Sequence, residues 1–526
     1  MNNKFNTYKN YFINLICPVF LFGAVTGSVT ALFVLLYKLC AHYMIHFSET
    51  GYDFLREHLW LIPVVLLTFV GIAFLFTIIY RRWPNLRGGG IPTSIAAMRG
   101  IIDFNWLSNL VGVFGLSLGS FLIGVPLGNE GPSVQMGTAV GSGTVRLLAK
   151  KHLAWEKYSM TGGACAGFSV ATGAPISGIL FAIEEAHQRI SPMIIMVATT
   201  SVMFANLTTK LLAPILGVSE GLFPALTLPT LAIKDIWIPV VVGIVIGLFA
   251  GAFLHYYKLL DGLFDRVLKR VPKTVKIFAI FALTMVLGLF SFSFVSTGHD
   301  LILGLLEGRT AIYLLLLILV LRTTTTLMAN TNGVTGGIFL PLLALGAVLA
   351  AIVANICINY FGLSESYYSI ILVFGIVGCI AGMMKMPLTA VVFAVEALSC
   401  HENLLFVIAT AGIAYVITEL FSVKSINDTV IEHRSESVHD GKIAKAVDTT
   451  VCVGKNSFAV GKEVRDIFWP RNVFILSIQH SIDAEEEVDD HGGSGIREGD
   501  ILHIRYSTYD EEKTKEELYA IVGEQL

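Results

Sequence analysis

The fold is decided by the stretch Gly128-Asn-Glu-Gly-Pro-Ser-Val-Gln-Met-Gly137, which places Gly, Pro and one ionisable residue at the start of an apolar helix. The second half of the chain contains a related stretch, Gly336-Gly-Ile-Phe-Leu-Pro-Leu-Leu-Ala-Leu-Gly346. Interrupted hydrophobic segments at matching places of two halves are typical of helices that stop midway through a membrane, with a binding site between their ends. The pattern therefore predicts a membrane protein built from two related halves.

The composition also requires a membrane. The 526 residues are 54% hydrophobic and 14% charged, with a mean hydropathy of +0.71, which is too apolar for a water-soluble domain. Apolar runs such as 11–40 and 59–80 exceed the roughly 20 residues that a helix needs to span a bilayer. Basic residues cluster at 81–87, 146–157 and 269–276, which predicts cytoplasmic loops there. We expect a multi-pass protein of the cell membrane with both termini in the cytoplasm.

Other functional classes find no support in the sequence. The net charge of −3 gives no indication of a nucleic-acid partner. The sequence has no H-E-x-x-H motif, no P-loop lysine and no C-x-x-C pair, so we expect neither an enzyme nor a metal site or cofactor. It also lacks a T-V-G-Y-G-type filter, which argues against a potassium transporter.

A second pair of stretches strengthens the internal repeat. Ala174-Pro-Ile-Ser-Gly-Ile-Leu-Phe-Ala-Ile-Glu-Glu185 matches Met386-Pro-Leu-Thr-Ala-Val-Val-Phe-Ala-Val-Glu-Ala397 in one register. The shared positions are Pro175/Pro387, Phe181/Phe393, Ala182/Ala394 and Glu184/Glu396. The sequence leaves open whether the two repeats are inverted, and ordinary kinked helices packed by small residues are the alternative.

Three glycine-rich segments each precede an apolar helix. They are Gly88-Gly-Gly-Ile-Pro92, Gly128-Asn-Glu-Gly-Pro132 and Gly336-Gly-Ile-Phe-Leu-Pro341. Each helix start offers free backbone N–H groups and the positive end of a helix dipole. Three such ends aimed at one point would bind an anion through partial charges, moderately enough for it to leave again.

Glutamates accompany these segments. Glu130 stands at the start of one of the helices, and an ionisable residue at membrane depth is by default a functional candidate. Its carboxylate can occupy the anion site and leave when it is protonated; the alternative is a simple helix cap. Of Glu184 and Glu185, one can pair with another helix while the other takes up protons from the cytosol. We interpret Glu396, the repeat mate of Glu184, as structural.

Together the motifs resemble the CLC family of chloride channels and chloride/proton antiporters. The resemblance rests on Gly-x-Gly-Ile-Pro, Gly-x-Glu-Gly-Pro, Gly-Ile-Phe-x-Pro and the helix that ends in Glu-Glu, and it covers about residues 15–430. It implies an all-α polytopic fold, an inverted repeat with many tilted and broken helices, and a homodimer with one pore in each subunit.

The resemblance also implies roles for single residues. Glu130 matches the gating glutamate, and Glu185 matches the internal proton-transfer glutamate of the antiporters. Backbone amides would line the anion site at Gly89, Gly90, Ile91, Ile338 and Phe339. Because both glutamates are present, we expect an exchanger of chloride, or another halide, for protons; the alternative is a passive chloride channel of the voltage-gated type.

Three positions depart from the family pattern. Gly89 replaces the usual Ser, Asn129 replaces the usual Arg, and Asn427 aligns with the usual Tyr of the inner gate, so we count Asn427 among the anion-binding positions. These departures leave open a fluoride/proton antiporter, although Glu185 and the intact Gly-Ile-Phe segment argue against it. They also raise the alternative of leaky coupling.

The end of the chain differs in composition from the rest. We expect a membrane domain over residues 1–435, a linker over 436–446 and a cytosolic α/β domain over 447–526 with a terminal helix from about residue 511. The stretch from Val453 to Pro470, followed by Gly499-Asp-Ile-Leu502, resembles a TrkA-C domain. The resemblance implies a regulatory module that binds a small molecule and forms dimers; a tail that only stabilises the dimer is the alternative.

Overall fold

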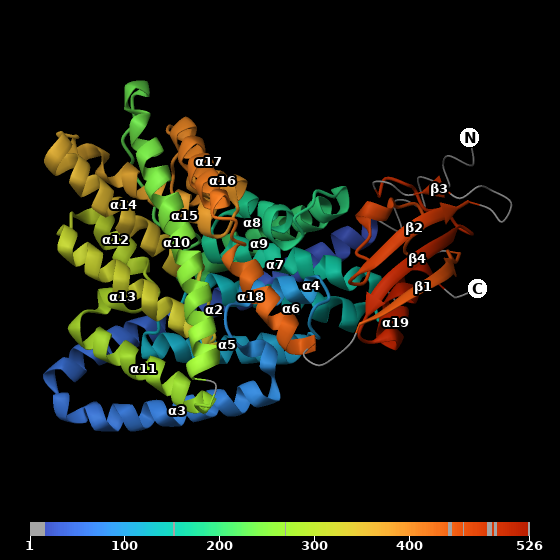
Figure 1. Ribbon diagram of the computed structural model, residues 1–526, viewed down its shortest axis with the longest axis horizontal. Coiled ribbons are helices and arrows are strands. Elements are labelled where there is room, and N and C mark those ends of the chain that lie inside the picture. Colours follow the sequence, from blue (N-terminus) through green and yellow to red (C-terminus); the bar gives the residue numbers. More distant parts are fainter. Residues whose placement is uncertain are drawn as a thin grey trace.

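A computed structural model describes residues 16–150, 153–268, 270–439, 444–455, 457–480, 487–488 and 492–523. The predicted start of the first apolar run at residue 11 and the location of the N-terminus lie outside these residues. A large helical part is followed by a small domain of strands, and α18 leads from one toward the other (Figure 1). The prediction of a mostly helical fold with a small α/β domain is confirmed.

The first half of the helical part contains the elements α2 to α9. They are α2 (Cys17–Glu57), α3 (Ile62–Arg82), α4 (Gly90–Met98), α5 (Trp106–Ile123), α6 (Glu130–Leu148), α7 (Glu156–Thr172), α8 (Pro175–Phe181) with a π-helical turn (Ala182–Ala186), and α9 (Pro192–Leu216). The second half contains α10 (Trp237–Val267), α11 (Lys273–Phe290), α12 (His299–Glu307), α13 (Ile312–Thr331), α14 (Phe339–Phe361), α15 (Tyr368–Met383), α16 (Pro387–Ala397) and α17 (Leu404–Leu420). Helix α18 (Ile426–His439) follows both halves.

Equivalent helices of the two halves pack on equivalent partners. Helix α2 packs on α9 as α10 packs on α17, α6 packs on α7 as α14 packs on α15, and α7 contacts α8 as α15 contacts α16. The halves meet through an antiparallel bridge between Gly128 and Gly337. The same packing in both halves, joined by an antiparallel pairing of equivalent loops, is the arrangement expected of an inverted repeat.

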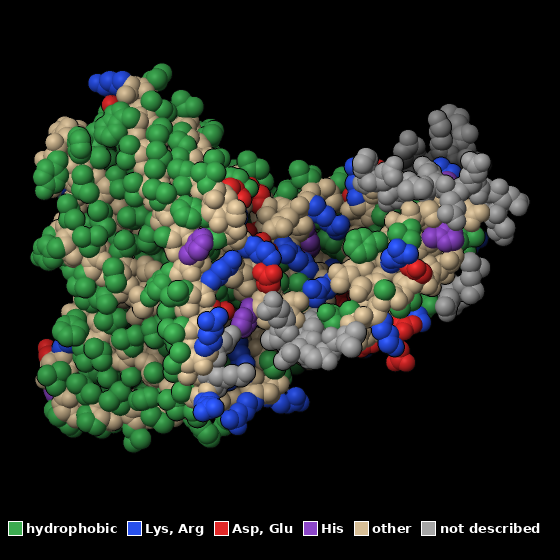
Figure 2. Space-filling model, viewed as in Figure 1, with side chains coloured by type: hydrophobic (Ala, Val, Ile, Leu, Met, Phe, Trp, Pro, Cys, Tyr) green, Lys and Arg blue, Asp and Glu red, His purple; other side chains and the backbone are tan. Residues whose placement is uncertain are grey.

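The helices suit a bilayer in length and surface. Within the described residues, nine helices are long and apolar enough to cross a membrane. Others are too short to cross, among them α4 with 9 residues and α16 with 11. Exposed hydrophobic side chains cover the face of the helical part in Figure 2, whereas Lys and Arg side chains gather toward the strand domain. An apolar belt of this kind is stable only in contact with lipid, so the protein is a multi-pass membrane protein.

The strand domain is a four-stranded antiparallel sheet with one helix. Its strands are β1 (Lys445–Cys452), β2 (Val473–Gln479), β3 (Glu487–Val488) and β4 (Ile501–Thr508), in the spatial order β1-β4-β2-β3. Helix α19 (Glu511–Val522) begins where the sequence predicts a terminal helix, and the Asp510 side chain caps it. Because α18 ends at His439 and β1 begins at Lys445, regular structure extends into the segment expected to be a linker.

Candidate functional site

The three glycine-rich segments meet in the interior of the helical part. Gly128 and Gly337 exchange two backbone hydrogen bonds, of 2.6 and 2.8 Å, and the Gly88 N–H donates to the Gly333 carbonyl at 3.0 Å. These pairings join loops that are more than 200 residues apart in the sequence. The starts of α4, α6 and α14 are thereby brought together, as the glycine pattern predicts.

Glycine is required here because the backbones touch. A Cβ atom on Gly90 would stand 1.9 Å from the Gly131 carbonyl oxygen, and one on Gly131 would stand 2.7 Å from the Gly337 Cα. Such distances are far below van der Waals contact, so any larger residue would push the helix starts apart. The close approach concentrates the positive ends of three helix dipoles in a small volume.

Glu130 is the first residue of α6, and it is fully buried at this meeting point. Neither of its carboxylate oxygens has a hydrogen-bond partner among the described residues. The side chain folds back over its own loop, since a Cβ on Gly128 would stand 2.5 Å from Glu130 Oε2 and 3.0 Å from the Leu340 Cβ. The carboxylate therefore lies between the starts of α6 and α14, where an anion would also be attracted.

The other predicted anion-binding residues lie at the same helix starts. Gly89 and Gly90 are the N-cap and first residue of α4, and Ile91 is buried beside them. Ile338 and Phe339 hold the same positions in α14. The first N–H groups of a helix have no partner within that helix, so each start can offer amides to an anion. The Phe339 ring packs against Phe168 and Phe393, with ring centroids 5.2 and 5.7 Å away.

Glu185 lies at a second place, in the π-helical turn that follows α8, and it is 2% exposed. The Asn427 side chain donates from Nδ2 to Glu185 Oε1 at 2.9 Å. Arg99 fixes the turn by donating to the carbonyls of Glu185 and Ala186, both at 2.9 Å, and it pairs with Asp428 at 3.2 Å. The structure thus brings Asn427 to the proton-transfer candidate, a contact that the sequence did not indicate.

The strand domain contacts the helical part close to Glu185. The Tyr158 hydroxyl donates to the Asp466 carbonyl and accepts from the Phe468 N–H at 3.0 Å. The Phe468 ring stacks on His187 with centroids 4.5 Å apart, and the Arg189 guanidinium lies 4.8 Å from its centre. These contacts were missed because ordinary aromatic and basic residues carry no pairing signal in a single sequence.

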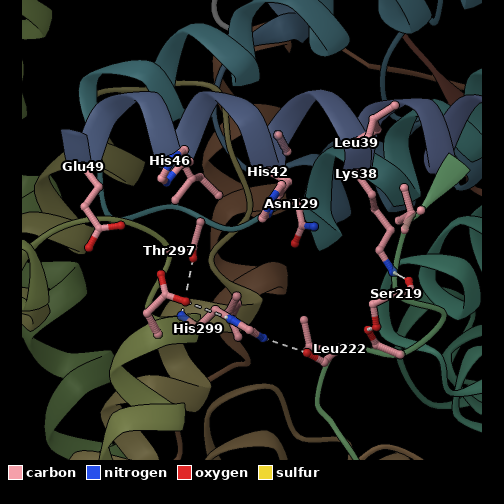
Figure 3. Close-up of a pocket in the computed structure, with 17 residues that line it drawn as sticks. Lys38, Leu39, His42, His46, Glu49, Asn129, Ser219, Leu222, Thr297 and His299 are labelled. Carbon is pink, nitrogen blue, oxygen red and sulfur yellow. Dashed lines mark hydrogen bonds and ion pairs between the residues drawn. The ribbon is translucent and has the colours of Figure 1, made fainter. Parts of the chain in front are cut away.

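A cavity of about 470 Å³ is lined among others by Asn129, which precedes Glu130 in the chain, and by Leu340. Lys38, His42, His46 and Glu49 point toward it from α2, and Thr297 and His299 face them across it (Figure 3). None of these α2 residues is a candidate from the sequence, because polar side chains in the C-terminal half of a membrane helix carry no signal of what they face.

Charged side chains of both signs line the cavity, Lys38 and His299 together with Glu49 and Asp300. Lys38 Nζ donates to the Ser219 carbonyl at 2.9 Å and the Val170 carbonyl at 3.3 Å, and it pairs with no carboxylate among the described residues. Both His299 ring nitrogens face oxygen acceptors, Nε2 the Leu222 carbonyl at 2.8 Å and Nδ1 the Asp300 carboxylate at 3.2 Å. Two acceptors favour the doubly protonated imidazolium. Because Asp300 balances the charge of His299, Lys38 is the cation of this lining that can attract an anion into the cavity.

Comparison with known proteins agrees with this architecture. The family model "Voltage gated chloride channel" matches residues 71–419. The H(+)/Cl(-) exchange transporter ClcA of Citrobacter koseri is 27% identical over 429 residues, which cover 78% of this chain and 88% of the relative. The protein of the same name from Vibrio parahaemolyticus is 26% identical over 439 residues, covering 79% and 90%.

Two solved structures are similar in fold. A slow cyanobacterial Cl−/H+ antiporter superposes with a TM-score of 0.70 at 22% identity, over 79% of this chain and 98% of that one. A CLC-type fluoride/proton antiporter superposes with a TM-score of 0.58 at 18% identity, over 77% and 96%. The family model covers well over half of the chain, and the broken helices, the repeat and the glycine loops are in place. The chain therefore belongs to the voltage-gated chloride channel family, the CLC proteins.

Proposed function

We propose that the protein exchanges chloride, or another halide, for protons across the cell membrane. The observation that carries the proposal is the placement of Glu130, a buried carboxylate without a hydrogen-bond partner among the described residues, where three helix starts meet. The names of the relatives, H(+)/Cl(-) exchange transporters, support the same ions.

In this proposal Glu130 is both gate and proton carrier. While it is ionised, its carboxylate occupies the place to which the helix dipoles attract an anion. Once it binds a proton it is neutral, the dipoles no longer hold it, and an anion takes its place. The same side chain then returns the proton to solution on one side of the membrane, so anion and proton movements alternate.

The anion would be held by amides at Gly89, Gly90, Ile91, Ile338 and Phe339, all at the starts of α4 and α14. Partial charges of this kind bind a halide without trapping it. Glu185 would pass protons between Glu130 and the side of the membrane on which the strand domain lies. Its burial beside Asn427 supports this role, because a carboxylate is retained inside a membrane protein at a high desolvation cost.

A fluoride/proton antiporter is the second candidate, favoured by Gly89 and Asn129 at positions where the family usually has Ser and Arg. A passive chloride channel is the third, and in that case Glu185 would have no transport role. Anion competition among chloride, fluoride and nitrate in proteoliposomes separates the first two.

The reversal potential of purified protein in a planar bilayer tests the exchange itself. Under a chloride gradient, a superimposed pH gradient should shift the reversal potential away from the chloride Nernst value. A reversal potential that follows the chloride gradient alone and does not change with pH would exclude exchange and support the passive chloride channel.

We also propose that residues 1–435 form the transport domain and that residues 447–526, after the linker 436–446, form a cytosolic TrkA-C-like regulatory domain. A cavity of about 270 Å³ between the domains supports a small-molecule ligand, because Lys157, Lys513, Glu516 and Glu517 line it.

The position of Phe22, near the start of α2, supports cytoplasmic N- and C-termini, because it places the start of α2 on the side of the strand domain. Its ring lies 5.9 Å from Trp155, which in turn contacts Phe458 of the strand domain.

A homodimer is proposed from the family resemblance. Apolar side chains exposed on α8, α9, α16 and α17 offer a continuous surface for it, including Ile176, Leu211, Leu388 and Leu405. Cross-linking of cysteines introduced at Ile176 and Leu388 in lipid vesicles tests the dimer. If only a product of monomer mass forms, the proposed homodimer is wrong.

A further inference from the structure

Asn330 is a buried polar residue that the roles described above leave unused. It lies near the end of α13 and is 6% exposed. The Tyr257 hydroxyl donates to its Oδ1 at 3.4 Å, which turns the amide nitrogen the other way. That nitrogen, Nδ2, is buried and has no hydrogen-bond partner among the described residues. A buried amide donor without an acceptor is destabilising, so the group is retained for a reason other than packing.

The amide nitrogen faces the start of α4. Asn330 Nδ2 lies 3.5 Å from the point where a Cβ on Gly89 would stand. Gly89 has no side chain, so it cannot itself supply a side-chain donor beside the amides of the helix start.

Positive charge surrounds this place. Arg434 reaches it from α18, with Nη2 3.0 Å from the point where a Cβ on Gly88 would stand, and its guanidinium donates to the Arg87 carbonyl and the Thr93 hydroxyl. The Arg87 side chain donates to the Tyr80 carbonyl at 3.4 Å, and its Nε has no hydrogen-bond partner among the described residues. Two guanidinium groups beside a helix start favour an anion there.

We propose that Asn330 is an anion-binding residue, whose Nδ2 donates a hydrogen bond to a small monovalent anion at the start of α4 and so compensates for the missing side chain at position 89. The proposal rests on the proposed anion transport and adds a residue that sets anion affinity. The ligand class is a halide or an ion of similar size, such as nitrate.

The geometry also predicts a compensating substitution. Gly89 has φ −67° and ψ 133°, a conformation that serine adopts without strain. The nearest atoms to a Cβ there, Pro92 Cδ at 3.4 Å and Asn330 Nδ2 at 3.5 Å, are at ordinary contact distance. A serine hydroxyl at position 89 would therefore reach the space that the Asn330 amide serves.

The experiment measures chloride binding to purified protein by isothermal titration, together with chloride flux from proteoliposomes. Asn330→Leu keeps the branched shape and the number of heavy atoms and removes the donor, so chloride affinity should fall about tenfold, the effect of one hydrogen bond to a charged group. Gly89→Ser in the Asn330→Leu background should restore affinity to within about threefold of the native protein. Asn332→Leu, two residues away with an amide that already donates to the Met328 carbonyl, is the matched control and should leave affinity unchanged.

Unchanged chloride affinity in Asn330→Leu would overturn the proposal, as would a loss that Gly89→Ser does not restore, because the residue would then be structural. If Asn330→Leu does not fold, Asn330→Asp replaces the donor by a carboxylate of equal size and should abolish chloride binding; retained binding would overturn the proposal. Native protein that neither binds nor moves any anion would instead remove the proposed function, independently of Asn330.

Discussion

Glu184, in the π-helical turn that follows α8, caps α16, and Glu396 of α16 caps α8. Glu184 accepts hydrogen bonds from the backbone N–H groups of Leu388 and Thr389, at 2.9 and 2.7 Å, at the start of α16. Glu396 accepts from those of Ile176 and Ser177, at 2.8 and 2.9 Å, at the start of α8. The two residues hold equivalent positions in the repeats, and each accepts hydrogen bonds from the other half, so together they join the two halves. We therefore assign both residues to the fold rather than to transport.

Glu184→Gln should lower the stability of the protein, because the neutral amide loses the attraction between a carboxylate and a helix start. We expect a loss of about 1–2 kcal/mol, and a similar loss for Glu396→Gln. The thermal unfolding midpoint in detergent measures the change. Glu365→Gln is the control, since Glu365 pairs with Arg309 at an exposed site and should cost much less. Equal midpoints for Glu184→Gln and Glu365→Gln would contradict the capping role.

Glu130→Gln should abolish proton movement while anion flux continues. The glutamine mimics the protonated side chain, so it no longer competes with the anion at the helix starts and carries no proton. Simultaneous chloride and pH electrodes on proteoliposomes record both fluxes. Glu307→Gln removes a carboxylate at the exposed end of α12 and should leave the flux ratio unchanged. Proton coupling retained in Glu130→Gln would exclude this residue as the gate.

The sequence predicts features that follow from its repeats and its glycine positions better than it predicts contacts between residues far apart in the chain. The meeting of the helix starts at Gly90, Gly131 and Gly337 was predictable. Backbones that touch where helices break require glycine, and the sequence shows glycine at these places in both repeats. The pairing of Glu184 with another helix was foreseen as one of two open roles for the Glu184–Glu185 pair.

The contacts that the sequence did not reveal are between distant residues of common types. Asn427 meets Glu185, and Tyr158 meets Phe468, across separations of 242 and 310 residues. Helix periodicity shows that such residues face inward, but it does not identify the inward-facing partner from another helix. A polar residue such as Asn330, among other polar residues near the end of α13, becomes notable only when its amide nitrogen lies beside Gly89 with no partner among the described residues.

Asn427→Leu should weaken proton coupling more than anion binding. The substitution removes the only side-chain hydrogen bond that Glu185 accepts in the described structure, so the carboxylate loses its fixed position beside α18. We expect proton flux to fall by about tenfold or less, the effect of one bond to a charged group, and Glu185→Gln to abolish it. If Asn427→Leu instead raises the chloride KM with the proton-to-chloride ratio intact, Asn427 acts as the anion ligand that the family alignment predicts.

Tyr158→Phe should loosen the strand domain from the helical part. The hydroxyl both donates to Asp466 and accepts from Phe468, and the loss of two buried partners costs about 1–3 kcal/mol. The rate of limited proteolysis within residues 436–446 reports the loosening, and it should rise several-fold. Tyr360→Phe, at an exposed position on α14, should leave the rate unchanged. Equal cleavage rates for the two variants would show that Tyr158 does not hold the domain.

Lys38→Met should raise the KM for chloride supplied from the cavity side. The cavity lies on the side of the membrane opposite the strand domain. Helix α9 begins next to Ser191, whose hydroxyl donates to the Asp466 carboxylate of the strand domain. The helix is 25 residues long, about 37 Å, and Gly217 and Val218 directly after its end line the cavity. Among the described residues the Lys38 ammonium has no carboxylate partner, so it raises the local anion concentration, and its loss should cost about threefold in KM at low ionic strength. The effect should fade as salt screens the charge, whereas the maximal rate should stay nearly constant. Lys234→Met removes the same charge from an exposed site in the segment between α9 and α10 and should change little. If both variants shift KM equally, the attraction comes from the overall charge of that face and not from Lys38 beside Glu130.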